Sequence, residues 1–248
     1  MRCMFAAILV AAIVAGPAPA RGEKPAPGDD RARGDDPASS VTARYGFNGW
    51  PTSTADESGN GHHLRILSFG GGRLRLVEHG PGTALAFPGK CTDPVCPHVV
   101  LQSTTSADLN PGSRNLAYGA DVLLPPGQTS TGQNVLQKGY SRTSSQYKLQ
   151  IDGAAGHPSC VLVDQLRPTI RIARSRISTA DGRWHRIRCQ RTGDRLEIYV
   201  DGVPYGGTSV PVTLSVSNNR PLSIGAKGPY RDNDQFNGVL DNVWVRIG

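Results

Sequence analysis

Carboxylates suited to paired acid–base chemistry are scarce in this sequence. Glycoside hydrolysis needs two carboxyl groups that flank the scissile bond, and two side chains on one face of a strand are two residues apart. Beyond residue 20 the glutamates are Glu23, Glu57, Glu78 and Glu197, and none has an acidic residue two positions further on. The chain also lacks a Gly-x-Ser-x-Gly elbow and a His-Glu-x-x-His motif. These absences predict a protein that is not an enzyme.

Arginine is concentrated in one stretch of the chain, where it could bind anions. Between Arg167 and Arg195 there are only two acidic residues, and the whole chain has a formal net charge of +7. Guanidinium groups suit sulfate, phosphate and carboxylate, and Arg186 and Arg188 would project from one face of a strand. The hypothesis is an acidic ligand bound by Arg174, Arg186 and Arg188. The alternative is a solvated sheet face, because positive charge alone carries little specificity.

A turn-rich loop, Gly228–Gln235, combines aromatic, basic and amide side chains. Loops on a rigid scaffold often carry binding residues, so Tyr230 and Arg231 are candidate sugar contacts. Other aromatic residues in polar, Gly-rich surroundings are Trp50, Tyr140 and Tyr205. Trp184 and Trp244 instead follow strand patterns, which predicts that they lie in the core. For any one loop aromatic, local packing is the alternative explanation. Specific nucleic acid binding is not expected, since no motif for it is present.

The first 40 residues are predicted to lie outside the globular domain. Arg2, a short apolar run and Ala18-Pro19-Ala20 are typical of a signal peptide over residues 1–20. The apolar run is too short to span a bilayer, and no other stretch is long enough. Residues 21–40 have no large apolar residue and predict a disordered linker or tail. The tripeptide Arg33-Gly34-Asp35 within it is interpreted as a chance match in a charged tract. The mature protein is therefore expected to be secreted and extracellular.

Four cysteines remain after the predicted signal peptide. An even number in an exported chain indicates disulfides rather than free thiols. Cys91 and Cys96 can close a small loop, and Cys160 with Cys189 would tie two strands of the sheet. A metal site is the alternative, but no Cys-x-x-Cys or nearby histidine pair supports one.

Short apolar-alternating runs bounded by Gly, Pro, Ser or Asp follow one another from Val41 to the end of the chain. Such runs predict β-strands, and no amphipathic helix longer than a turn or two interrupts them. In Arg183–Gly202, two runs are joined by Thr192-Gly193-Asp194, which predicts a β-hairpin. The other expected strands are 41–47, 64–67, 74–77, 84–87, 99–102, 116–124, 135–138, 147–152, 160–164, 169–173, 222–225 and 239–247. The fold class is therefore all-β, a sandwich over residues 41–248. The two-sheet antiparallel jelly-roll form is what the family resemblance described next implies.

Three segments resemble the laminin-G-like, concanavalin A-like jelly-roll family. They are the loop Asp56–Gly61, the hairpin with Trp184-His185 and Leu196-x-Ile198-Tyr199-Val200-Asp201-Gly202, and the last strand Gly238–Val245. In that family the first and last strands lie side by side. The resemblance therefore implies that Tyr45-Gly46-Phe47 lies against Val243-Trp244-Val245.

The resemblance also implies a structural calcium site. Carried over by position, its ligands would be Asn48, Asn60 and Asp241, and Gly61 or His62 could add a carbonyl oxygen. Calcium gains affinity with the number of carboxylates, so this set predicts weak binding. The alternative is that Asn60 and Asp241 serve as hydrogen-bond partners of the loop backbone.

The leading hypothesis from these observations is a secreted, lectin-like, non-catalytic module that binds acidic or cell-surface carbohydrate. The alternatives are a protein-interaction or adhesion module, with a cell-surface or extracellular protein as partner, and a polysaccharide lyase of the same fold. In a lyase, His185 or Tyr199 could take part in the chemistry. The oligomeric state cannot be predicted from the sequence.

Overall fold

The computed structural model describes residues 41–49, 54–104 and 107–248. The compact unit 37–248 contains all the strands described below. The predicted signal peptide, the predicted linker, the Arg-Gly-Asp tripeptide and Trp50 lie outside the described residues.

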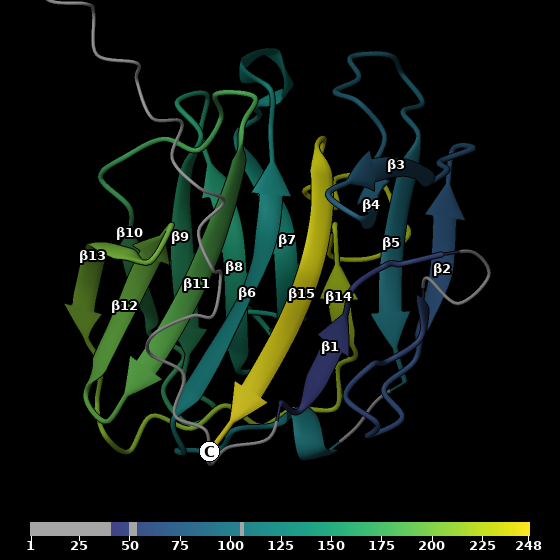
Figure 1. The fold of residues 1–248 in the computed structure, drawn as a ribbon. Helices are drawn as coiled ribbons and strands as arrows, with labels where there is room; N and C mark the ends of the chain where they lie inside the picture. The colour runs from purple at the N-terminus through teal and green to yellow at the C-terminus, as the bar shows by residue number, and fades with distance from the viewer. Residues whose placement is uncertain (1–40, 50–53, 105–106) are drawn as a thin grey trace, which may run out of the picture. The chain divides into compact units, whose positions relative to one another are not determined.

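Within the described residues, the strands form two sheets in which every pairing is antiparallel (Figure 1). Sheet A has eight strands in the order β13-β12-β11-β6-β15-β4-β3, with β1 paired to β15. Its strands are β1 (Ala43–Tyr45), β3 (Arg75–His79), β4 (Gly82–Ala86), β6 (Leu116–Leu123), β11 (Trp184–Thr192), β12 (Arg195–Val200), β13 (Val203–Ser209) and β15 (Val239–Ile247).

Sheet B lies behind sheet A in Figure 1 and has seven strands in the order β10-β9-β8-β7-β14-β5-β2. They are β2 (Leu64–Phe69), β5 (His98–Ser103), β7 (Gly132–Gly139), β8 (Gln146–Asp152), β9 (His157–Val163), β10 (Ile170–Arg174) and β14 (Leu222–Ile224). The helical elements with described bounds are the short 3₁₀ turns η2 (Ala107–Leu109) and η3 (Pro126–Gln128). The all-β sandwich predicted from the sequence is confirmed.

The first and last strands are neighbours, as the resemblance implied, but the segment that pairs with Val243–Val245 is Ala43–Tyr45 rather than Tyr45–Phe47. In β1, Ala43 pairs with Val245 and Tyr45 with Val243 of β15. Tyr45 is fully buried, and its hydroxyl donates a 2.7 Å hydrogen bond to the carbonyl of His62. The pairing of β1 with β15 thus joins the two ends of the domain, and the Tyr45 hydroxyl fixes β1 to the loop before β2.

Alternating apolar residues of both sheets meet in one core. Leu196, Ile198 and Val200 of β12 are buried, as their spacing predicted. Tyr118 of sheet A and Tyr147 of sheet B contact each other with ring centroids 5.2 Å apart. Each sheet therefore turns one face to the core and one outward.

Both expected disulfides are present. Cys91 and Cys96 close a small loop. Cys160 lies on β9 and Cys189 on β11, so their disulfide connects sheet B to sheet A. The sequence predicted that this pair ties two strands; the structure adds that the strands belong to opposite sheets.

Strand β13 was missed in the sequence because its composition, Val-Pro-Tyr-Gly-Gly-Thr-Ser, disfavours a strand. As an edge strand it tolerates Pro204. Gly206 is required there because a Cβ atom would lie 2.0 Å from the carbonyl oxygen of Arg174. The glycine thus permits the edges of the two sheets to approach each other.

Candidate functional site

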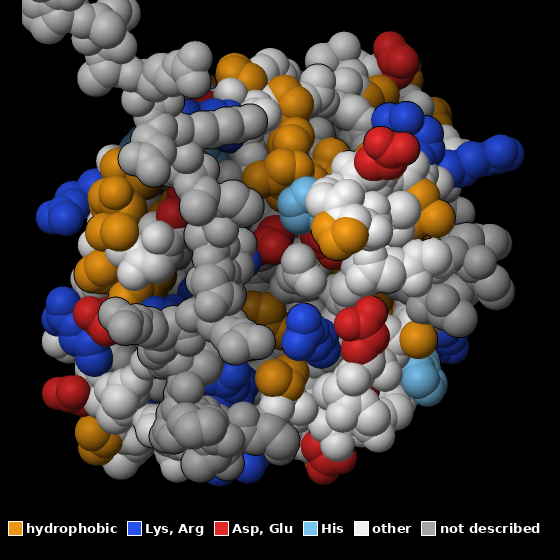
Figure 2. All heavy atoms as spheres, viewed as in Figure 1, with side chains coloured by type: hydrophobic (Ala, Val, Ile, Leu, Met, Phe, Trp, Pro, Cys, Tyr) orange, Lys and Arg blue, Asp and Glu red, His pale blue; other side chains and the backbone are white. Residues whose placement is uncertain are grey.

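The outer face of sheet A faces the viewer in Figures 1 and 2. The strand register aligns a row of residues across five strands of this face. Arg188 of β11 pairs with Tyr199 of β12 on one side and Gly119 of β6 on the other. Gly119 pairs in turn with Trp244 of β15, which pairs with Arg44 of β1. We call Tyr199, Arg188, Gly119, Trp244 and Arg44 the aromatic row. Because glycine has no side chain, the row has a gap between a guanidinium and an indole.

Cations cover part of the aromatic surface in this row. The guanidinium carbon of Arg188 lies 4.1 Å from the Tyr199 ring centroid, and that of Arg246 lies 5.6 Å from the Trp244 ring. Such cation–π contacts orient the guanidinium groups along the sheet. The structure therefore presents aromatic carbon beside positive charge, which suits a sugar that carries an acidic group.

The prediction that Trp184 and Trp244 lie in the core was wrong. Both belong to the outward-facing positions of their strands and are partly exposed. Trp184 stacks on the imidazole of His79 with ring centroids 3.8 Å apart and an interplanar angle of 18°. The alternating pattern was read correctly, but alternation alone does not say which set of side chains faces inward.

A second set of aligned residues brings two carboxylates together. Asp121 of β6 pairs with Arg186 of β11 and with Asp241 of β15. We call Arg186, Asp121 and Asp241 the acidic row. Asp121 and Asp241 come from strands that are distant in sequence. Sequence spacing, which shows only acids two residues apart on one strand, therefore does not reveal this pair. In Figure 2, carboxylates, a histidine and hydrophobic side chains meet near the middle of this face.

Each carboxylate of the acidic row is bound by protein donors. Asp121 lies 3.4 Å from Arg186 Nε and accepts a 2.8 Å hydrogen bond from the Asn242 side chain. Asp241 Oδ2 lies 2.6 Å from His79 Nδ1, and its Oδ1 accepts a bond from the Asn242 backbone. Burial raises the pKa of Asp241 and the nearby Asp121 charge adds to this, while the hydrogen bonds from His79 and Asn242 oppose it. These contacts fix the orientation of the two acids on the sheet face.

The two residues considered for lyase chemistry are also engaged. His185 has Nδ1 2.8 Å from Asp201 Oδ2 and Nε2 3.1 Å from Asp181 Oδ1, so both ring nitrogens face carboxylates. The Tyr199 hydroxyl donates to Glu197 at 2.9 Å. Neither side chain is directed at an open cavity by these contacts.

The outer face of sheet B differs in that its polar side chains are buried. Tyr147, Leu149 and Ile151 of β8 point to the core, so Lys148 points outward, yet it is only 8% exposed. Lys148 pairs with Gln137 of β7, which pairs in turn with Ser223 of β14. Both of these residues are also buried. Burial lowers the pKa of Lys148 to about 8, an effect that the Asp234 carboxylate partly opposes.

The predicted ligand residues divide between the two faces. Arg186 and Arg188 share the outer face of sheet A, as predicted. Arg174, 60% exposed in its side chain, lies on β10 of sheet B, where Nη2 is 3.5 Å from Asp152 Oδ2. Tyr230 and Arg231 are exposed on the loop that follows β14. The arginine-rich stretch is therefore not one binding surface.

The proposed calcium ligands have three different sets of partners. Asn60 donates its amide to the carbonyl oxygens of Val41 and Thr42 at 3.2 and 2.9 Å. Asn48 accepts a bond from the Thr83 backbone, and Asp241 lies against His79. The amide nitrogen of Asn60 is thus engaged by the backbone. Calcium binding by Asn48, Asn60 and Asp241 stays a prediction.

Asp56 organises the loop that carries Asn60. Its carboxylate accepts 3.0 Å hydrogen bonds from the backbone amides of Arg44, Ser58 and His62. Burial opposes ionisation, but these bonds lower the pKa of Asp56. One acid thus ties the loop to β1.

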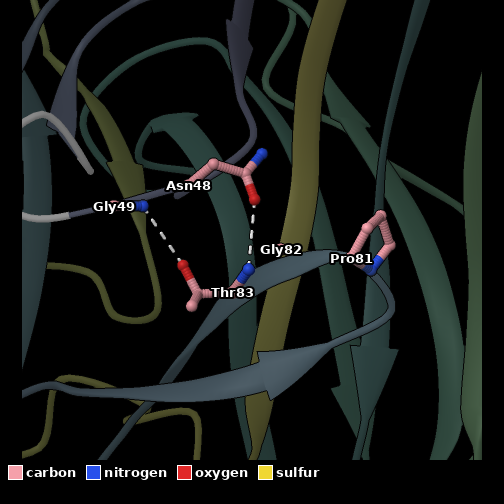
Figure 3. A pocket seen from close by; sticks show the side chains of 5 residues that line it. All are labelled: Asn48, Gly49, Pro81, Gly82 and Thr83. Carbon is pink, nitrogen blue, oxygen red and sulfur yellow. Dashed lines mark hydrogen bonds between the residues drawn. The ribbon is translucent and has the colours of Figure 1, made fainter.

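Asn48 borders a shallow hollow of about 490 Å³ at the turn between β3 and β4 (Figure 3). The other lining residues are Gly49, Pro81, Gly82 and Thr83. Gly49 donates to the Thr83 hydroxyl at 3.2 Å, and a Cβ atom on Gly82 would lie 2.0 Å from Asn48 Oδ1. The Asn48 amide therefore fills the space that the glycine leaves.

Among residues 41–49, 54–104 and 107–248, no group of three or more His, Cys, Asp or Glu side chains could hold a metal ion. In the same ranges, no helix combines the length and apolar character needed to cross a membrane.

A family model described as the concanavalin A-like lectin/glucanases superfamily matches residues 104–246. A search of curated protein sequences gave no match. Among solved structures, the binding domain of Paraclostridial Mosquitocidal Protein 1 has a TM-score of 0.63 at 12% identity, covering 84% of this chain and 48% of that one. The receptor binding domain of botulinum neurotoxin D gives 0.57 at 11% identity, covering 84% of this chain and 49% of that one. This chain thus spans about half the length of these toxin chains.

Domain 4 of AbnA, an extracellular GH43 arabinanase from Geobacillus stearothermophilus solved with arabinotriose, has a TM-score of 0.61 at 15% identity. The match covers 85% of this chain and 93% of that domain. At these identities the likeness shows a shared fold.

Proposed function

This chain belongs to the concanavalin A-like lectin/glucanase superfamily, and we propose that it is a secreted, non-catalytic module that binds acidic carbohydrate through the outer face of sheet A. The observation that carries the proposal is the aromatic row, in which Trp244 and Tyr199 lie in register with Arg188 and Arg44 around Gly119. Aromatic rings stack on sugars, and guanidinium forks bind carboxylate or sulfate.

Three further features support this proposal. The similar domain from the arabinanase was solved with arabinotriose, and the toxin domains are described as binding domains. Both disulfides and the predicted signal peptide are typical of an exported protein. The carboxylates of the acidic row are held by Arg186, His79 and Asn242, which favours a binding role over bond cleavage.

The test is a glycan array with the purified full chain, followed by calorimetry on uronate and sulfated oligosaccharides. We expect Trp244→Ala and Arg188→Ala each to weaken binding by about tenfold, since one aromatic or charged contact contributes roughly 1–3 kcal/mol. Arg167→Ala is the matched control, because Arg167 is exposed in the same stretch but lies between β9 and β10. Failure of every acidic glycan to bind, or equal losses in all three variants, would refute the proposal.

One observation favours a second candidate, a protein-interaction module. Ile170 and Ile172 lie on the edge strand β10 and are 51% and 40% exposed. Exposed apolar side chains on an edge strand are a typical docking surface for another protein. Ile170→Lys with Ile172→Lys should then abolish capture of a cell-surface protein while leaving glycan binding intact. Unchanged capture would exclude this edge.

A further inference from the structure

The loop after β14 places a carboxylate between two lysines on the outer face of sheet B. Asp234 Oδ2 lies 2.5 Å from Lys227 Nζ and 3.8 Å from Lys148 Nζ. The backbone carbonyl of Asp234 accepts a 2.9 Å hydrogen bond from the amide of Asn134 on β7. The loop is therefore fixed to the sheet directly beside Lys148.

Lys148 has a distant anionic partner at this position. Its side chain is 10% exposed, and Nζ lies 3.8 Å from Asp234 Oδ2, which is longer than a hydrogen bond. A buried ammonium needs a close anionic partner to offset its desolvation. The short contact of Asp234 is with Lys227, so a single carboxylate is the partner of both ammonium groups.

Other charges nearby compensate for the second lysine only in part. Asp152 is the next acid, but its oxygens already accept hydrogen bonds from Gln150 and Ser159, and it pairs with Arg174. Lys148, Lys227 and Asp234 together therefore carry a net positive charge.

Two residues of the loop have positive φ, and two amide oxygens in or beside the loop lack partners. Asp232 and Asp234 have φ values of 59° and 52°, in the left-handed region that Asp enters more readily than most residues. The amide oxygens of Asn134 and Asn233 are buried and have no hydrogen-bond partner within the described residues.

We infer that Lys148 and Lys227 form a carboxylate-binding site for a uronic acid residue, and that the chain's own Asp234 occupies this site in the absence of ligand. The sugar carboxylate takes the place of Asp234 between the two ammonium groups. This site lies on sheet B and does not depend on the binding face proposed on sheet A.

The test uses Asp234→Asn, which keeps the shape and the tolerance of positive φ but removes the competing charge. The matched control is Asp232→Asn, in the same loop and with the same backbone conformation. All variants carry Trp244→Ala, so that the contribution of sheet A to binding is lowered equally in each of them. The probes are an oligogalacturonide and inorganic sulfate, measured by calorimetry on the folded full chain.

We expect Asp234→Asn to bind the oligogalacturonide about tenfold or more tightly than its Trp244→Ala parent. In the parent, only molecules whose Asp234 has left the two lysines can bind the sugar, and this lowers the apparent affinity. Asp232→Asn should leave affinity unchanged, and adding Lys148→Met to Asp234→Asn should remove the gain.

An unchanged or lower affinity in folded Asp234→Asn would overturn the inference, as would a gain that survives Lys148→Met. Tighter binding of sulfate alone would overturn the assignment to a carboxylate. None of these outcomes bears on the separate effect of Trp244→Ala in the wild-type background, which tests the face on sheet A.

Discussion

Arg186 on sheet A and Lys148 on sheet B show two different ways of holding a positive charge on the outer face of a sheet. The Arg186 side chain is 57% exposed and contacts the largely buried carboxylate of Asp121. The Lys148 side chain is 10% exposed and lies under the loop that contributes Asp234. The first cation is presented to solvent, whereas the second is buried with a partner from its own chain.

The difference shows why a basic stretch of sequence is a poor guide to a binding surface. Arg174 and Arg186 are near neighbours in the chain, yet they belong to strands of different sheets. Exposure then depends on which loops cover each face, and these loops come from elsewhere in the sequence. Charge becomes available to a ligand only where the fold leaves it uncovered.

The largest expected effect concerns the connection that holds both faces in one domain. Removing the disulfide between the sheets by Cys160→Ala with Cys189→Ala should lower the free energy of unfolding by roughly 3–4 kcal/mol, because the sequence separation of 29 residues restricts the unfolded chain. The Cys91–Cys96 disulfide closes a shorter loop, so Cys91→Ala with Cys96→Ala should lower the free energy of unfolding by only roughly 2 kcal/mol. Urea unfolding without reductant measures both, and a larger cost for the short loop would contradict this view.

A matched substitution on each face tests the contrast in burial. Lys148→Met should raise the free energy of unfolding at pH 7 by roughly 1–3 kcal/mol, because folding lowers the pKa of Lys148 from 10.5 to about 8. Arg186→Met on sheet A should change it by less than about 0.5 kcal/mol, as expected of an exposed side chain.

The sign of the pH dependence follows from the same shift. Between about pH 8 and 10.5 the unfolded state binds more protons at Lys148, so the destabilisation by this lysine disappears as pH rises. The gap between Lys148→Met and wild type should therefore close toward pH 10.5 in denaturant titrations. A gap that stays constant with pH would mean that methionine acts through packing alone.

The smallest expected effect distinguishes two roles of Asp241 on sheet A, calcium ligand and hydrogen-bond partner of His79. Asp241→Ala should lower stability by about 1–2 kcal/mol, because the contact of Asp241 with His79 is lost inside the sheet face. Thermal unfolding in excess calcium and in chelator should show the same loss. A loss confined to calcium would instead establish Asp241 as a metal ligand.

Local pattern in the sequence was sufficient for the sandwich and most of its strands. Alternation of apolar residues and turn-forming Gly, Pro and Asp act over a few residues, so they can be read without knowing the fold. The same information identified all four disulfide cysteines, and the resemblance correctly placed β1 beside β15. The local pattern failed for β13, where Gly206 allows a close approach between the edges of the two sheets.

Tertiary structure alone decided which residues meet. The Asp121–Asp241 pair, the aromatic row and the position of Asp234 between Lys148 and Lys227 all join segments distant in sequence. It also decided that Trp184 and Trp244 face outward, because a strand's period of two defines two faces but not which one is buried. The sequence by itself determined the strands and their cross-links, and the pairing and stacking of the sheets determined the surfaces available for binding.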